Sequence, residues 1–328
     1  MIENFLNIKH STRNLSDEKF DEILPTLARE LSHVDILPKY NHSQLKNDWK
    51  KLCDWSPQGT MINSTSRLGM KLCEHFFPNF YNIKDHKNVS FADLWKDEAL
   101  LMKVLKWNRK SHSTPYLSEL KRGIYFCGGL AKSTMYRPQM AKLATTGCEV
   151  VLDPCCGWGG RMLGSVANGC DYYGFEPNTE TYKGLNELAE YLEITDKVNL
   201  FCDDALNMND YDIPDVDCVL TSPPYFNLEV YCDEESQSIT NCDTYDEWVS
   251  NFLSPLINKS LEKLKKEGKS CWNVAKIRQG DMWEDVIKIH EQSGFIQSEE
   301  YIMCSSKRQV NGSGKSHDKT ISFENCLI

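Results

Sequence analysis

A chain of 328 residues with 41% hydrophobic and 26% charged residues has the composition of an ordinary globular protein and is long enough for two folding units. Its net charge of −10 argues against general polyanion binding, but the charge is unevenly distributed. Residues 1–130 carry 19 basic and 15 acidic side chains, whereas residues 131–328 carry 18 and 32. A nucleic acid partner would therefore have to contact the first part or local basic loops.

The sequence also bears on location and on metal chemistry. No apolar run approaches the length of a membrane span, and the first residues do not resemble a signal peptide, so a cytoplasmic location without a membrane partner is expected. The 14 cysteines show no C-x-x-C spacing, and Cys155 and Cys156 are adjacent. We therefore expect reduced structural thiols rather than a metal site or a disulfide framework.

The first 130 residues predict a mostly helical domain. Ser16 is a suitable N-cap, and the residues after it place a hydrophobic stripe on one helix face: Phe20, Ile23, Leu24, Leu27 and Leu31. A second helix is expected from about Asp93 to Trp107. Basic residues lie in this helix and beyond it: Lys106, Arg109, Lys110, Lys121 and Arg122. They could stabilise the helix C-terminus on a solvated face, or they could contact phosphate.

From about residue 148, strand and helix signals alternate. This pattern predicts an α/β domain over residues 131–328, with a mostly parallel sheet covered by helices on both faces. Seven strands are expected, at residues 149–152, 171–175, 198–202, 217–221, 270–275, about 296–303 and 321–327. Helices are expected at residues 178–192, 245–264 and 281–292. Only the loop Ser305–Lys319 separates the last two strands, which predicts an antiparallel hairpin at the end of the sheet.

A glycine-rich loop follows the first strand of this domain. In Val150–Arg161 a strand leads into an acidic turn at Asp153 and then a glycine-rich helix entry. Gly157 and Gly159 let the backbone approach a ligand closely, although a tight strand–helix turn would have the same sequence. Glu176 lies 23 positions after Asp153, close to the offset expected of a ribose-hydroxyl acceptor.

Further carboxylates narrow the kind of ligand. Asp203 and Asp204 follow the third strand, where they could accept from an adenine amino group. Together with Asp153 and Glu176 they would repel a pyrophosphate. An adenosine cofactor with a positive centre fits better, and this points to S-adenosylmethionine.

A second motif ends the fourth strand. The apolar run Asp217–Thr221 stops at Pro223 and Pro224, which cannot donate ladder hydrogen bonds. The turn presents the Ser222 hydroxyl, main-chain carbonyls and the Tyr225 ring at the carboxyl end of the strand, where ligands bind in open α/β sheets. Such groups suit a planar ring that bears an amino group, although a purely structural strand stop would look similar.

From about Ser133 to its end, the chain resembles the S-adenosylmethionine-dependent DNA amino-methyltransferases, which methylate the exocyclic nitrogen of cytosine (N4) or adenine (N6). The resemblance implies a seven-stranded Rossmann-like methyltransferase sheet, and it assigns catalysis to Ser222-Pro223-Pro224-Tyr225. It assigns cofactor binding to the segment before the first strand, to the glycine-rich loop and to the residues that follow the second and third strands: Arg137, Pro138, Asp153, Pro154, Cys155, Gly157, Gly159, Glu176, Pro177, Asp203 and Asp204. Two positions depart from the family pattern, Cys155 and Gly160-Arg161.

The resemblance also implies a mechanism. A base flipped out of DNA would donate its amino hydrogens to Ser222 and a proline carbonyl, while Tyr225 stacks on it and Phe226 flanks it. Serine at position 222 favours cytosine N4 over adenine N6. The alternatives are methylation of an RNA base, for which similar loops are known, and a non-catalytic cofactor-binding or partner-binding protein.

Recognition of the target is assigned by elimination. Only 69 positions separate Asp153 from Ser222, which leaves no room for an inserted target-reading domain. Residues 1–130 are therefore expected to read the target. The loop before the last strand carries further candidates for phosphate contact, which fit a solvated loop equally well: Lys307, Arg308 and Lys315.

Overall fold

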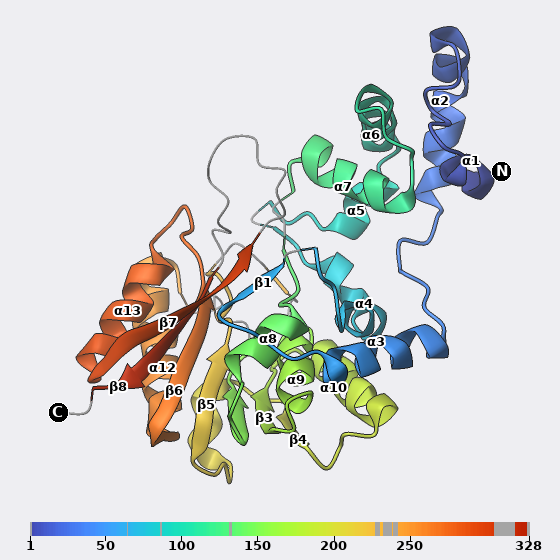
Figure 1. Ribbon diagram of the computed structural model, residues 1–328. Coiled ribbons are helices and arrows are strands. Elements are labelled where there is room, and N and C mark those ends of the chain that lie inside the picture. The colour runs from blue at the N-terminus through green and yellow to red at the C-terminus, as the bar shows by residue number, and fades with distance from the viewer. Residues whose placement is uncertain are drawn as a thin grey trace. The chain divides into compact units, whose positions relative to one another are not determined.

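The chain folds into two units (Figure 1). The computed structural model describes residues 2–63, 65–85, 87–130, 133–226, 230–231, 238, 242–304 and 319–326. The first unit is built from residues up to Pro38 and from Asn79–Thr134; the second takes Lys39–Pro78, Met135–Phe226 and the described residues from 242 onward. The segment Lys39–Pro78, which the expected boundary at residue 130 placed in the N-terminal domain, thus belongs to the second unit.

The first unit is helical, as its sequence pattern predicts. It contains α1 (Ile2–Asn7), α2 (Asp17–Ser32), α5 (Phe91–Lys96), α6 (Glu98–Lys110), α7 (Leu117–Gly128) and most of the 3-10 turn η1 (Pro78–Asn82). Ser16 caps α2 by accepting from the Lys19 N–H, as expected. The helix predicted from Asp93 to Trp107 is instead two helices, because Asp97 ends α5 and its carboxylate caps α6.

The helices of the first unit share one hydrophobic core. It joins the predicted stripe of α2 to apolar residues of α5, α6 and α7, and its fully or nearly fully buried members include Phe20, Leu31, Trp95, Leu101, Leu105, Leu120 and Ile124. The unit therefore has its own core, as an independently folding domain requires.

The second unit contains an eight-stranded sheet in the order β1-β7-β8-β6-β5-β2-β3-β4. The seven expected strands are β2 (Val150–Asp153), β3 (Asp171–Phe175), β4 (Val198–Phe201), β5 (Val216–Thr221), β6 (Leu264–Val274), β7 (Phe295–Cys304) and β8 (Lys319–Asn325). Strand β8 is antiparallel to β6 and β7, which confirms the predicted hairpin. The sequence did not predict β1 (Met61–Asn63), which pairs parallel to β7. Three residues are too few to show a periodic pattern.

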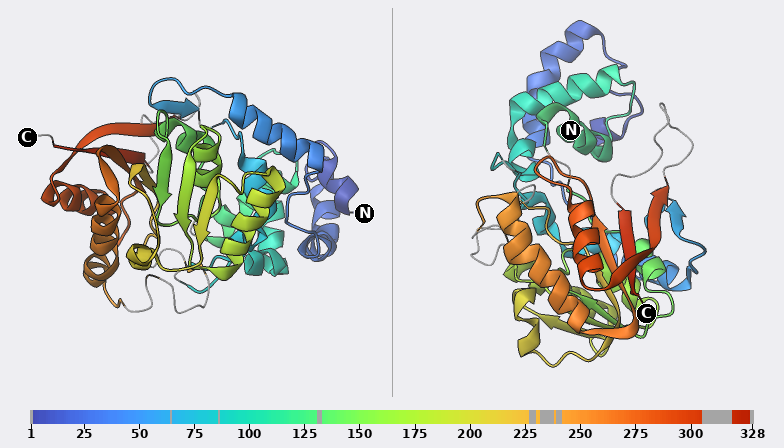
Figure 2. Two further views of the ribbon diagram at one scale, coloured as in Figure 1. Left: turned by 90° about the horizontal axis from the view of Figure 1, so that it is seen from below. Right: turned by 90° about the vertical axis from the view of Figure 1, so that its left-hand side faces the viewer.

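Helices cover both faces of this sheet. The strand order reverses between β2 and β5, so right-handed crossovers place α9 (Gly160–Val166) and α10 (Thr179–Leu192) on one face and α12 (Ser254–Glu262) and α13 (Met282–Gln292) on the other. Figure 2 shows α12 and α13 side by side next to β6. The remaining elements are α3 (His42–Asp54), α4 (Met70–Phe76), α8 (Pro138–Ala144), α11 (Tyr245–Trp248), the 3-10 turn η2 (Ala205–Asp210) and the π-helical turn η3 (Val249–Leu253). This is the Rossmann-like methyltransferase fold that the sequence predicts.

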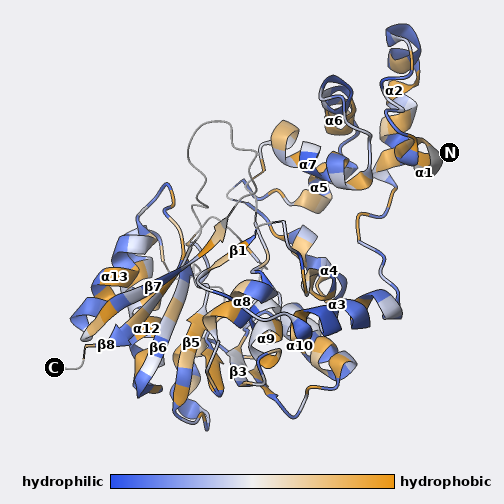
Figure 3. Cartoon of the chain, viewed as in Figure 1, coloured by the Kyte–Doolittle hydropathy of each residue, from blue (hydrophilic) through white to orange (hydrophobic). Residues whose placement is uncertain are grey.

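The central strands β2 and β5 carry fully buried apolar residues. Figure 3 shows β5 as hydrophobic along much of its length, and Val151, Leu152, Val219 and Leu220 are fully buried. Because both faces of these strands are covered, polar groups that follow them must emerge at the carboxyl edge of the sheet. Within the part of the chain that is described, no helix is both long and apolar enough to cross a membrane. In that same part, no group of three or more His, Cys, Asp and Glu side chains could hold a metal ion.

Candidate active site

The residues predicted on the glycine-rich loop, on the proline loop and after β3 and β4 lie at the carboxyl ends of β2, β3, β4 and β5. The ends of three strands are tied directly to one another. The Thr221 hydroxyl at the end of β5 donates to Asp153 at the end of β2 (2.8 Å), and Glu176 after β3 accepts from the Gly157 N–H (2.8 Å). The glycine-rich loop and the loop that begins at Ser222 are therefore neighbours.

Asp153 is completely buried and fully used by the protein itself. One carboxylate oxygen accepts from the Cys155 N–H (3.1 Å) and the Thr221 hydroxyl, while the other accepts from Arg161 Nε and the Tyr172 hydroxyl (2.7 and 2.6 Å). Four donors match the acceptor capacity of a carboxylate. In this structure Asp153 therefore holds the glycine-rich loop in shape, and its carboxylate has no further acceptor position for a ligand.

The departure from the family pattern at Gly160-Arg161 has a packing reason. Arg161 is a buried cation that pairs with Asp153 and also donates to the Cys155 carbonyl. A Cβ on Gly160 would lie 2.0 Å from the Tyr136 carbonyl oxygen, so only glycine lets the chain before α8 lie against α9. That chain carries Arg137 and Pro138; Arg137 donates to the Ser66 carbonyl (2.8 Å), and Pro138 begins α8.

Cys155 is not a nucleophile in this environment. Burial raises its pKa strongly, and the Asp153 charge raises it further, so the thiol stays protonated. Pro154 is buried beside it, and Gly157 and Gly159 adopt the positive φ angles of 54° and 71° that the turn requires. The loop thus provides backbone groups and shape rather than reactive side chains.

Glu176 bridges the glycine-rich loop and the start of α10. Its two oxygens accept from the Gly157 N–H and the Asn178 N–H (3.0 Å). Burial raises its pKa to about 7 from an ordinary value of 4.5, although the two backbone hydrogen bonds act in the opposite direction. Each oxygen keeps one acceptor position, so Glu176 can still accept from a ligand hydroxyl.

This pKa gives a testable pH dependence. The folded chain binds the Glu176 proton more tightly than the unfolded chain, so stability should fall as the pH rises from about 4.5 to about 7. We expect Glu176→Gln to remove that fall, so that the melting temperature of the variant relative to the parent is higher at pH 8 than at pH 5, even though the glutamine NH2 cannot accept one of the two backbone N–H groups. Thermal denaturation of both proteins without cofactor measures it. An equal difference at the two pH values would contradict the prediction.

Asp203 and Asp204 follow β4 and have separate partners. Asp203 accepts from the Asn207 amide (3.0 Å) and the Tyr211 hydroxyl (2.9 Å). Partial burial raises the pKa of Asp203, but these hydrogen bonds outweigh it and lower the pKa overall. Asp204 caps η2 through the Leu206 N–H (2.9 Å). Hydrogen bonds thus favour the ionised form of Asp203, whereas Asp204 has a structural role as the cap of η2.

The loop after β5 is held by a residue that the sequence did not single out, Asn273 at the end of β6. Its side-chain amide donates to Ser222 Oγ (3.4 Å) and to the Tyr225 hydroxyl (3.3 Å), and Tyr225 donates to its backbone carbonyl (3.3 Å). The Tyr225 hydroxyl uses its proton for the Asn273 backbone carbonyl and can only accept from the Asn273 side chain. The side-chain atom of Asn273 next to this hydroxyl is therefore assigned as the amide nitrogen. The signal that could have identified Asn273 is a polar residue between Trp272 and Val274, in the buried last part of the strand next to that of the proline loop.

A chain of hydrogen bonds extends from this loop. Thr320 at the start of β8 donates to Asn273 Oδ1 (3.1 Å), and the Tyr136 hydroxyl bonds to Thr320 (2.8 Å). The Arg161 guanidinium lies 5.2 Å from the centre of the Tyr136 ring. The glycine-rich loop and the proline loop are thus connected both through Thr221 and through this second route.

Asn273→Ala should slow catalysis without preventing folding. Two neutral hydrogen bonds to the proline loop are lost, each worth roughly 1 kcal/mol, so we expect methyl transfer to fall about 10- to 30-fold. Cofactor affinity should stay unchanged. Single-turnover rates and cofactor titration separate the two quantities. The exposed Asn199→Ala on β4 is a matched control. A wild-type rate in Asn273→Ala would contradict this assignment.

Phe226 and the tail loop complete the predicted site. Phe226 is buried, with φ of 47°, and packs against Tyr245 and Trp248 of α11. The three basic residues predicted to contact phosphate from the tail loop lie outside the described residues: Lys307, Arg308 and Lys315. Pro177 precedes α10 and is partly exposed.

The basic residues of the first unit are mostly engaged by the unit itself. Arg109 donates to the Thr12 and Leu15 carbonyls and pairs with Asp17 (2.7 Å). Lys121 donates to the Ile36 carbonyl and the Tyr81 hydroxyl, and Arg122 pairs with Glu119. Arg109 and Lys121 therefore tie helices to loops, whereas Lys106, Lys110 and Arg122 are the exposed cations of the predicted set.

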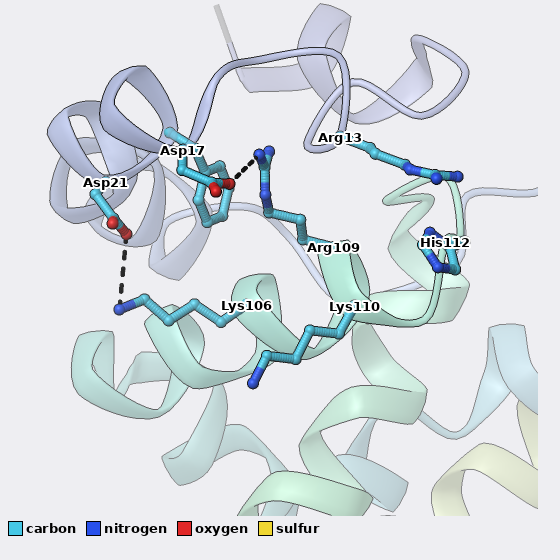
Figure 4. A pocket seen from close by; sticks show the side chains of 8 residues that line it. Arg13, Asp17, Asp21, Lys106, Arg109, Lys110 and His112 are labelled. Atoms are coloured by element: carbon cyan, nitrogen blue, oxygen red, sulfur yellow. Dashed lines mark hydrogen bonds and ion pairs between the residues drawn. The ribbon is translucent and has the colours of Figure 1, made fainter.

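These cations border a cavity of about 630 Å³ in the first unit (Figure 4). Its lining is mainly basic: Arg13, Asp17, Phe20, Asp21, Lys106, Arg109, Lys110 and His112. Figure 4 shows Arg109 turned towards Asp17 and Lys106 towards Asp21, while Lys110 points away from both carboxylates. The Lys106–Asp21 pair is long (3.7 Å) and exposed, so it holds Lys106 only weakly.

Comparisons with known proteins bear on the second unit. The family described as RNA cap guanine-N2 methyltransferase matches residues 148–253, a span that contains both loops of the candidate site. No curated protein matches the chain. The match covers about a third of the 328 residues, so it bears on the catalytic unit and leaves the first unit unassigned.

Solved structures resemble the chain only distantly. An rRNA methylase from Streptococcus thermophilus is 14% identical with a TM-score of 0.40, covering 59% of this chain and 99% of that one. A SAM-dependent O-methyltransferase from Thermotoga maritima is 14% identical with a TM-score of 0.42, covering 60% and 69%. At these values neither carries an argument about substrate. The fold and the family match together place the chain in the class of S-adenosylmethionine-dependent methyltransferases.

Proposed function

We propose that this chain transfers a methyl group from S-adenosylmethionine to an exocyclic amino group of a base in RNA. The observation that carries the proposal is the adjacency of the proline loop and the acidic, glycine-rich loop, whose strands are joined by the Thr221–Asp153 hydrogen bond of 2.8 Å. The sequence favoured DNA as the substrate, with RNA as an alternative, and the proposal now takes RNA. The matching family acts on RNA, and nothing in the fold or the comparisons favours DNA methylation.

The residues at the sheet edge fit the cofactor by their chemistry. Glu176 keeps an acceptor position on each oxygen, which suits the two hydroxyls of a ribose, and Asp203 is an ionised acceptor after β4. The glycines of the loop leave room for the backbone of Pro154–Gly159 to contact the ligand. When bound, the cofactor would supply a methyl group on a positively charged sulfur.

In the proposed mechanism the proline loop orients the amine. Ser222 Oγ and a carbonyl of Pro223 or Pro224 accept from the amino hydrogens, and the base stacks on Tyr225. Ser222 already accepts from Asn273, so its own O–H can donate to a ring nitrogen next to the amine. These contacts hold the nitrogen lone pair towards the methyl group, and no covalent enzyme intermediate is required.

A second candidate is methylation of cytosine N4 in DNA. Ser222 favours it, because the resemblance to the DNA amino-methyltransferases associates serine at this position with cytosine. The two candidates differ in the polymer and the base but use the same loops.

One experiment separates the two candidates. The full chain is incubated with labelled S-adenosylmethionine and separate pools of total RNA and genomic DNA, and the nucleosides are analysed by mass spectrometry. We expect a methylated amino nucleoside in the RNA pool, with N2-methylguanosine as the first product to seek. N4-methylcytosine in the DNA pool alone would establish the second candidate. No labelled nucleoside in either pool would refute both.

A further inference from the structure

We propose that the first unit binds unpaired nucleotides of single-stranded RNA on a surface formed by Trp107, Arg122 and Phe126, together with Lys103, Lys106 and Lys110. We call it the α6–α7 surface. The inference rests on the proposed function for the choice of RNA and extends it by assigning a substrate-binding site outside the catalytic unit.

An aromatic stack is the centre of this surface. The Phe126 ring on α7 stacks on the Trp107 ring of α6, with centroids 5.6 Å apart and planes inclined by 24°. The Arg122 guanidinium lies over the Trp107 ring at 5.4 Å and is held in place by Glu119 at 2.7 Å. The stack is therefore ordered before any ligand arrives.

Gly123 makes this arrangement possible. A Cβ at that position would lie 2.6 Å from Val104 Cγ1 and 3.1 Å from Trp107 Cε3. Glycine therefore lets Val104 and Trp107 of α6 approach the α7 backbone. The stack is a consequence of how the two helices pack.

The outer face of the stack is open. Phe126 is 69% exposed, the largest value among the exposed large hydrophobic side chains of the described residues. A phenyl ring that already stacks on one partner and is exposed on the other side suits a further planar ring. Nucleobases are the planar groups that proteins bind in this way, and only unpaired bases can reach such a ring.

The positive charge of the lysines on α6 favours a nucleic acid over an apolar protein as the partner of this surface. At 100° per residue, Lys103, Lys110 and Lys106 lie about 40°, 60° and 100° around α6 from Trp107, on one side of it. Among the described residues, neither Lys103 nor Lys110 has an ion pair or a side-chain hydrogen bond. Residues 103–126 hold six Lys and Arg and one Glu, a net charge of +5 in a chain of −10.

The lysine row connects the stack to the basic cavity of Figure 4, because Lys106 and Lys110 also line that cavity. A base on Phe126 would thus have cations beside it for the adjoining phosphates, with Arg13 and His112 beyond them.

The test measures binding of the full chain to a fluorescein-labelled poly(U) oligonucleotide by fluorescence anisotropy, without cofactor. Phe126→Ala should weaken binding about 5- to 100-fold, and Phe126→Tyr should retain it, because the lost interaction is ring stacking. Lys110→Gln should reduce the slope of log K against log salt by about 0.7, the value for one phosphate on a single strand. Ile296→Ala, which removes a 54% exposed side chain in the second unit, is the control and should bind as the parent does.

Three outcomes would overturn the inference. Phe126→Ala could bind poly(U) as tightly as the parent does, or Phe126→Leu could do so although it has no ring. Phe126→Ala could also weaken binding to a duplex as much as binding to the single strand. The binding assay needs no methyl transfer, so the two proposals fail separately. Binding that depends on Phe126 in a chain that methylates no RNA would refute the proposed function alone. RNA methylation by a chain whose binding ignores Phe126 would refute this inference alone.

Discussion

Arg161→Met is expected to be the most destabilising single change in the catalytic unit. The Arg161 side chain is 5% exposed and that of Asp153 is completely buried, so the substitution leaves a carboxylate without its counter-charge in the core. Breaking a buried ion pair in this way typically costs about 3–5 kcal/mol, and we expect about 3 kcal/mol because Tyr172, Thr221 and the Cys155 N–H still donate to Asp153. Urea denaturation of parent and variant measures the loss.

Two further variants make this prediction specific. Asp153→Asn combined with Arg161→Met removes the uncompensated charge, so the double variant should be more stable than Arg161→Met alone. Lys183→Met removes a lysine that pairs with Glu187 at 3.7 Å on the surface, and it should leave the denaturation midpoint unchanged. If Arg161→Met is as stable as the parent at neutral pH, the buried pair does not support the glycine-rich loop.

Tyr225→Ala is expected to cause the largest loss of activity without a loss of fold. The ring is the proposed stacking partner of the base, and stacking contributes about 1–3 kcal/mol, so kcat/KM for RNA methylation should fall about 10- to 100-fold. The side chain is only partly buried, and its hydroxyl contacts Asn273 rather than the hydrophobic core. Rates with saturating cofactor and varied RNA measure the effect.

The conservative variant separates the ring from the hydroxyl. Tyr225→Phe keeps the stacking face and loses the hydrogen bonds of the hydroxyl, those to Asn273 among them, so its rate should fall clearly less than that of Tyr225→Ala. Cofactor affinity should be the same in both variants, because Tyr225 lies on the proline loop and not on the glycine-rich loop. An equal loss in Tyr225→Phe and Tyr225→Ala would show that the hydroxyl, and not the ring, is required.

The two units need not move as one for these predictions to hold. The catalytic contacts all lie within the second unit, and the α6–α7 surface lies within the first. Truncation is a poor way to separate them, because α3, β1 and α4 come from residues 39–78 and belong to the second unit. Substitutions such as Phe126→Ala are therefore better tests than deletion of the N-terminal part.

Much of the catalytic unit could be predicted from the sequence because its signals are local. Apolar runs bounded by glycine, proline and acidic residues indicate strands β2 to β8, and the carboxyl ends of parallel strands must meet at one edge. Asp153, Glu176 and Ser222 could therefore be placed at a common site from their positions after strands alone. Ser16 could be placed at the start of α2 for the same reason, since a cap acts over one helical turn.

The tertiary structure was needed to show which hydrogen bonds and ion pairs each polar side chain forms. The sequence alone determined strands β2 to β8 and the two loops, because hydrophobic periodicity and the residues that end a strand are local features of the chain. Only the fold decided that Asp153 forms a buried ion pair with Arg161 and that Asn273 donates to Tyr225. Only the fold decided, too, that Arg109 and Lys121 donate to groups of their own unit. Hydrogen bonds and ion pairs join residues far apart in the chain, and no local pattern records which donor reaches which acceptor.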